Sequence, residues 1–156
     1  MANQICNVFK EHLLKGNHNF SSSGGDTYKI ALYTSSLTVS DGSSVTGYST
    51  TNEASNSAGS GYTAAGNTLT NNGVTGSSST STVFADFADT SWTSVSTTAR
   101  YAVIYQSSGG AATAGAATDS AVCVLDFGGD FTTSAGTLTI QFPAADTSNA
   151  VIRISG

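Results

Sequence analysis

The chain has 156 residues, and only 10% of them are charged, against about 25% in ordinary soluble domains. Its net charge of −5, with five Lys and Arg in all, argues against nucleic-acid binding, because contact with phosphates depends on basic side chains. No apolar run reaches the length of a membrane span, and the N-terminus lacks the apolar core of a secretory signal. We therefore expect one domain over residues 1–156, made in a cytosol and not associated with a membrane.

The first segment has the pattern of a helix over residues 3–15. Its apolar residues recur at helical spacing, at Ile5, Val8, Phe9 and Leu13. Asn3 can cap the start and Gly16 can end it. It is the only helix that the sequence predicts. Cys6 and His12 lie within it, but their spacing matches no zinc pattern, so we expect a surface or turn histidine.

A strand over residues 26–34 follows, with Tyr28, Ile30 and Leu32 alternating against more polar residues, so one face should be buried. Residues 35–60 are rich in Ser, Thr, Gly and Asn. They predict a long surface excursion with at most a short strand at 45–49. Such a loop is unusual in a compact domain and is the natural place for contact with a neighbour.

Residues 61–66 resemble a phosphate-binding loop only superficially, because the Lys that would complete it is missing and no apolar strand precedes it. Leu69 marks a short strand, and Asn72–Gly73 predicts a tight hairpin turn into Val74. A strand over 81–87 comes next, with its turn at residues 88–90.

The strand over residues 98–106 is the one around which the others should be arranged. Its apolar residues fall on both faces, which is typical of the middle of a sheet. A strand over 92–96, opened by Trp92, precedes it, and a loop of small residues over 107–118 follows. The apolar strand over 119–127 should then pair with it in antiparallel fashion.

The chain should turn at Gly128–Asp130, run as a strand over 137–142 until Pro143, and end in a strand over 151–154. Some eight short strands separated by turns indicate a mainly β fold, a single-domain β-sandwich with the N-terminal helix on an edge or an end. A jelly roll is one arrangement of such strands.

Arg100 lies at the start of the central strand, where a cation normally has a carboxylate partner. Asp86, Asp89 and Asp126 are the candidates, and the pair should be a structural clamp. The two cysteines, Cys6 and Cys123, lie in unlike settings and should be free thiols.

We expect no catalytic residues, no metal and no cofactor. The carboxylate pairs Asp86 with Asp89 and Asp126 with Asp130 lie at strand ends, where turn capping is the simpler role. No Gly-x-Ser-x-Gly motif is present, and both histidines lie in the first eighteen residues. An enzyme with so few titratable groups would be unusual, so a hydrolase or metal enzyme is the least favoured reading.

Several blocks of the chain, spread over its whole length and in a constant order, resemble a group of small virion structural proteins of tailed bacteriophages. The blocks are Met1–Phe20, Asp26–Thr34, Gly61–Thr63, Asn67–Thr70, Phe87–Asp89 with Trp92, Thr98–Tyr105, Val124–Gly128, Ile140–Ala145 and Val151–Ile154. The resemblance implies a non-enzymatic component of a virus particle.

Within that group we expect a capsid decoration or cement protein that binds the major capsid protein from outside and bridges capsomers, as a homotrimer at local threefold positions. The contacts should come from the helix, through Phe9 and Leu13, or from the long loops, through Tyr48 and Tyr62. The alternative is a tail or fibre module that holds a host glycan, with Tyr48 and Tyr62 stacking on the sugar, although Tyr62 fits a core position equally well.

Overall fold

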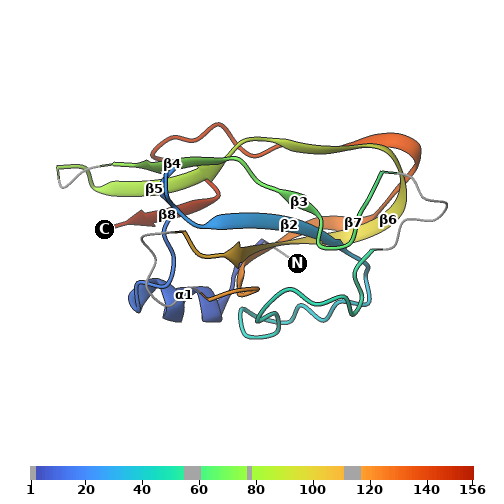
Figure 1. Ribbon diagram of the computed structural model, residues 1–156, viewed down its shortest axis with the longest axis horizontal. Coiled ribbons are helices and arrows are strands. Elements are labelled where there is room, and N and C mark those ends of the chain that lie inside the picture. The colour runs from blue at the N-terminus through green and yellow to red at the C-terminus, as the bar shows by residue number, and fades with distance from the viewer. Residues whose placement is uncertain (1–2, 55–60, 77–78, 111–116) are drawn as a thin grey trace.

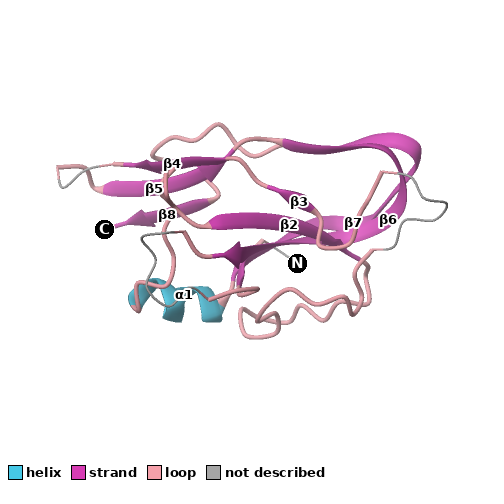
Figure 2. Ribbon diagram, in the orientation of Figure 1, coloured by secondary structure: helices cyan, strands magenta, loops and turns pink. Residues whose placement is uncertain are grey.

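The computed structural model describes residues 3–54, 61–76, 79–110 and 117–156, which form two antiparallel sheets and one short helix (Figures 1 and 2). The five-stranded sheet has the order β1 (Gln4–Ile5), β7 (Ala121–Ile140), β6 (Thr90–Ser108), β2 (Thr27–Tyr33), β3 (Asn67–Thr68). The three-stranded sheet has the order β4 (Asn71–Thr75), β5 (Thr82–Phe87), β8 (Ile152–Ser155). The predicted mainly β fold is thus confirmed, and the layers are those of a β-sandwich. The strand order does not confirm a jelly roll.

The strand expected at the centre lies there. β6 pairs with β2 on one side and with β7 on the other, so that Ile104 faces both Ile30 and Cys123. Its residues from Tyr101 to Tyr105 are all buried, because apolar side chains on both faces need cover from both sides. The antiparallel pairing predicted for this strand and the apolar strand after it is confirmed.

β6 and β7 are each one long strand, where the sequence predicts two. The Gly128–Asp130 segment is not a turn: the register passes from Tyr101 opposite Asp126 to Ala99 opposite Phe131, so residues 127–130 all lie opposite Arg100. Gly128 adopts a left-handed φ of 82°, which favours glycine. The extra residues of β7 form a bulge, and regular pairing resumes at Phe131. The ribbon of β6 and β7 turns over between the layers on the right of Figure 1.

The helix α1 (Asn7–Leu14) is shorter than predicted, because its expected first turn is extended. Ile5 pairs with Cys123 in the sheet, and the Cys6 N–H donates to the carbonyl of Val122 at 3.0 Å. Asn3 does not cap the helix; its Oδ1 accepts the N–H of Asp126 at 3.0 Å. Sheet pairing over this segment outweighs the helical pattern, which is a weaker local preference.

Cys6 and Cys123 are both free and buried, and the pairing of β1 with β7 brings them to neighbouring positions in space. Burial raises the pKa of the Cys6 thiol to about 11 and raises that of Cys123 further. Both thiols are therefore protonated at neutral pH and act as small core side chains.

Two predicted turns and loops differ from the structure. Asn72 and Gly73 lie inside β4, where Gly73 has a φ of 91° at a register shift, and so the glycine makes a bulge instead of a hairpin turn. No strand forms at 45–49 among the described residues; Gly47 makes a single bridge to Ser120. The rest of the expected 35–60 and 107–118 loops falls partly on residues 55–60 and 111–116, outside the described residues, while β6 itself reaches Ser108.

Candidate functional site

Arg100 pairs with Asp126, one of the three carboxylates considered for it, with 3.6 Å between Nε and Oδ1. Its guanidinium carbon also lies 5.3 Å from the ring centre of Tyr101. The pair spans the bulge where β7 leaves the regular register. The side chain of Asp126 is buried and that of Arg100 is about a third exposed. The ion pair therefore holds β6 and β7 together at the bulge.

Asp86 and Asp89 bind backbone amides instead of Arg100. Asp86 accepts the N–H of Val151 at 3.3 Å, and Asp89 accepts the N–H of Phe142 at 2.9 Å. Both carboxylates therefore tie the segment between β7 and β8 to the end of β5. This arrangement satisfies backbone donors and gathers no reactive groups.

The four residues considered for contact with a partner do not form one surface. Phe9 is 2% exposed and Tyr62 is 7% exposed, so both side chains belong to the core. Their burial contradicts the expectation that these two side chains contact a partner. Leu13 is half-buried at the edge of a pocket beside α1. Tyr48 is half-buried and stacks on Tyr105, with 4.9 Å between the ring centres.

A cluster around Glu53 explains how the long polar excursion is held. Glu53 accepts hydrogen bonds from the hydroxyls of Tyr48 at 2.8 Å and Tyr62 at 2.6 Å, and from the N–H of Ala65 at 2.7 Å. The Tyr62 hydroxyl in turn accepts the N–H of Leu32 in β2 at 3.0 Å. Desolvation and the bond to Glu53 raise the pKa of Tyr48 to about 12. The excursion is thus fastened to the sheet by aromatic hydroxyls.

A second polar cluster lies beneath the start of β2. Asp26 accepts the N–H groups of Asn19 at 2.7 Å and of Gly110 at 2.8 Å, and it also accepts a bond from the Gln106 amide. Gln106, fully buried, donates to the carbonyl of Asn17 at 3.0 Å. This cluster was not predicted from the sequence. The signal was present as a polar Gln106 at the end of the most apolar strand.

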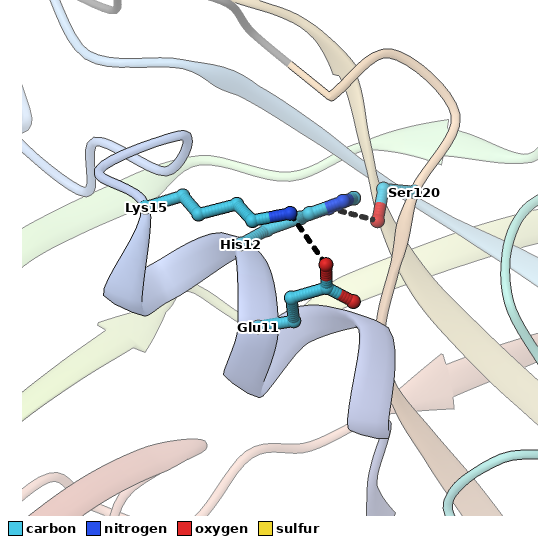
Figure 3. Close-up of polar contacts among 4 residues, drawn as sticks. All are labelled: Glu11, His12, Lys15 and Ser120. Atoms are coloured by element: carbon cyan, nitrogen blue, oxygen red, sulfur yellow. Dashed lines mark hydrogen bonds and ion pairs between the residues drawn. The ribbon is translucent and has the colours of Figure 1, made fainter.

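α1 docks on the sheet through a histidine (Figure 3). His12 Nδ1 lies 3.0 Å from Ser120 Oγ, while Glu11 pairs with Lys15 one turn along the helix, with 2.5 Å between Oε1 and Nζ. A serine and a histidine in contact are two of the three members of a catalytic triad, but no carboxylate in the described part of the chain orients the imidazole, and Glu11, the acid next to it in the sequence, pairs with Lys15. Among the described residues, no group of three metal-ligating side chains gathers either.

Two of the hollows lined by the described residues are candidate binding places. The first, here called the β7 groove, has a volume of about 710 Å³ and lies along β7 and the segment after it, with Asp126, Asp130, Phe131 and Phe142 in its lining. The second, here called the helix pocket, has about 310 Å³ and lies between α1 and the three-stranded sheet. Exposed apolar side chains border both: Phe131 at the groove, and Val74 and Ile154 at the pocket.

The described part of the chain holds no helix long and apolar enough to cross a membrane. The chain matches no protein-family model, no curated protein and no solved structure.

Proposed function

We propose that the chain is a non-enzymatic structural protein of a tailed-phage virion, a decoration or cement protein that binds the outer surface of the capsid and bridges capsomers. The observation that carries the proposal is the placement of exposed apolar side chains at two separate ends of a chain with few charges. Val74 and Ile154, in the three-stranded sheet, are 55% and 58% exposed, and Phe131, in the β6–β7 ribbon, is 45% exposed.

Two separated contact surfaces are what a bridging protein needs. Figure 1 shows the three-stranded sheet ending at the left of the view and the β6–β7 ribbon turning over at the right. Neutral and apolar contacts suit binding to a protein shell, since interface cores are depleted of charged residues. The fastening of the excursion by Glu53 favours a stiff module, which loses little entropy on docking.

The test is reconstitution on expanded capsids that lack the protein. Added protein should occupy the shells at fixed sites and raise their resistance to heat, and electron microscopy should place it between capsomers at local threefold positions. A homotrimer would let each contact be weak, since three linked contacts bind together. Absence of binding to any shell would contradict the proposal.

Matched substitutions test separately whether the three-stranded sheet and the β6–β7 ribbon contact the shell. Val74→Asp and Phe131→Asp should each lower shell occupancy, because a charge would enter a desolvated contact. Thr75→Asp and Thr132→Asp introduce the same charge at the neighbouring exposed positions and serve as controls. Equal occupancy for all four variants would mean that neither end touches the shell.

The alternative is a tail- or fibre-associated module that binds a host glycan. Tyr48 and Tyr62 no longer support it, because both rings are used inside the chain. The β7 groove supports it instead, since Phe131 offers an exposed ring beside the carboxylates of Asp126 and Asp130. A glycan array and a cell-adsorption assay, each with Phe131→Ala as the variant, test this reading.

A further inference from the structure

A third hollow, here called the Asp119 hollow, lies where α1, the polar excursion and the residues before β7 meet. Its volume of about 330 Å³ is within the range of ligand sites, roughly 300–1,000 Å³. The lining includes Val8 and His12 of α1, Thr46 and Tyr48 of the excursion, and Thr118 and Asp119 before β7. Val74, Ile154 and Phe131, which the proposed function assigns to the shell, do not line it.

Hydrogen bonds hold the walls of this hollow together. Gly47 bridges to Ser120, and the Tyr48 N–H donates to the carbonyl of Asp119 at 2.7 Å. The His12 imidazole, which comes from α1, lies 3.0 Å from the Ser120 hydroxyl (Figure 3). Because each wall is fixed to the next, the hollow exists before anything binds, and binding requires little ordering of the chain.

Asp119 is one of two carboxylates that the fold leaves without a partner. Of the ten Asp and Glu residues, all but Asp119 and Asp130 have a hydrogen bond or an ion pair within the described part of the chain. Asp130 lines the β7 groove, which already has a proposed role, and Asp119 lines the Asp119 hollow. A carboxylate whose acceptor capacity is unused at a formed hollow points to a donor from outside the chain.

The Asp119 carboxylate is accessible, because the residue is exposed. Its charge reaches the tyrosine stack beside the hollow. Burial raises the pKa of the Tyr105 hydroxyl most, and the charges of Tyr48 and Asp119 raise it further. Tyr48 stacks on Tyr105 and is itself part of the lining, so the carboxylate belongs to the same small region of the surface.

Among the described residues, no cation of the chain lines the hollow. Lys10 and Lys15, on the helix segment, bond to other side chains of that segment. The lining also contains the apolar side chains of Val8 and Ala117. The hollow thus combines an anionic acceptor with a small apolar wall, which matches a cation carried on an alkyl stem.

We propose that the Asp119 hollow receives the side chain of a lysine from a partner protein, with the ammonium group at the Asp119 carboxylate and the alkyl stem against Val8 and Ala117. Charge complementarity selects this occupant, because the lining holds a carboxylate without a cation and the chain has a net charge of −5. An ammonium group has three N–H donors, so it can also donate to the hydroxyls of Thr46 and Thr118. A carboxylate or phosphate is disfavoured by the same charge.

The experiment compares two probes that differ by one ammonium group. Isotope-labelled protein is titrated at pH 7 and low salt with Nα-acetyl-lysine methylamide and, separately, with Nα-acetyl-norleucine methylamide, and the backbone amide shifts are followed by NMR. We expect the lysine probe to shift the amides of Gly47, Tyr48 and Asp119, and to bind about twofold to fivefold more tightly than the norleucine probe, as an exposed ion pair does. High salt should remove the difference, because it screens exposed charges.

Matched variants assign the preference to one carboxylate. Asp119→Asn removes the charge and suits the left-handed φ of 64° at this position, which Asn tolerates as Asp does, so both probes should bind it equally. Asp146→Asn removes the same charge from an exposed loop outside the lining, and the preference should remain. Should Asp119→Asn fail to fold, Thr118→Lys places a cation of the chain itself beside the hollow and should abolish the preference.

Three results would overturn the proposal: equal affinity of the wild type for the two probes, shifts confined to residues outside the hollow, or a preference that persists in Asp119→Asn. A preference that Asp146→Asn also removes would overturn it as well, since it would report the net charge of the chain instead of a site. A dimer that Asp119→Asn abolishes, with no preference between the probes, would assign the hollow to a second copy of the chain and overturn the partner proposed here. The titration uses the purified chain alone, so its result does not depend on whether the protein binds a capsid.

Discussion

The two sheets of this protein differ in how completely they are covered. In the five-stranded sheet, the middle of β6 is buried on both faces, and the polar groups around it, such as Gln106, have partners. In the three-stranded sheet, one apolar face continues past the core, and Val74 and Ile154 remain exposed there. The first sheet therefore contributes most of the buried core, while the second leaves part of an apolar face exposed.

The largest effect should come from the covered sheet. Ile104→Ala removes a fully buried side chain that faces Ile30 and Cys123, and should lower the free energy of unfolding by about 3 kcal/mol. Urea unfolding followed by circular dichroism measures it. A loss below about 1 kcal/mol would mean that this sheet is not the stable part of the molecule.

The next effect concerns the polar cluster that closes the covered sheet. Asp26→Asn puts an amide hydrogen-bond donor beside the N–H groups of Asn19 and Gly110 and should cost about 2 kcal/mol of stability. Asp41→Asn is the matched control. Asp41 bonds only within its own exposed loop, through Ser43 and Ser44, and its replacement should change the unfolding midpoint little.

The boundary between the two sheets should respond to pH through His18. Its pKa falls from the ordinary 6.5 to about 4 because of burial, with His12 lowering it further and Asp26 opposing. The folded protein thus resists protonation that the unfolded chain accepts, so this contribution is complete above pH 6.5 and is lost as the pH falls toward 4. At about 1.4 kcal/mol per pKa unit, the loss across that range should reach at most about 3 kcal/mol.

Unfolding curves at several pH values between 7 and 4 measure this loss. In His18→Gln the pH dependence within that range should flatten, because the titrating group is gone. A slope that His18→Gln leaves unchanged would assign the pH dependence to other groups.

The fold could be predicted where the pattern of apolar residues was strong, and the site could not. Val103 and its neighbours on β6, apolar on both faces, indicated the central strand, its partner strand and the sandwich. The bulge at Gly128 could not be told from a turn, because a glycine with a left-handed φ serves both. The length of helix α1 was also misjudged, since the pairing of Ile5 with Cys123 is a contact between distant parts of the chain.

The functional residues were harder to predict for the same reason. The sequence left Tyr62 open between a contact residue and a core residue, and its contacts with Glu53 and Leu32, which no local pattern encodes, place it in the core. His18 is buried because Tyr28 and Asp26, which the fold brings to one side of its ring, lie next to it, and no local pattern shows this. Only Asp126 among the three partners considered for Arg100 was placed within reach of it.

The smallest effect completes the comparison, because it uses the same substitution on the other sheet. Ile154→Ala removes a side chain that is 58% exposed and should change the free energy of unfolding by no more than about 0.5 kcal/mol. Its consequence should appear in binding instead, as lower occupancy of the capsid shells. A loss of stability close to that of Ile104→Ala would show that the exposed face already serves the fold. An unchanged occupancy would show that Ile154 is an isolated surface residue, of the kind that needs no explanation.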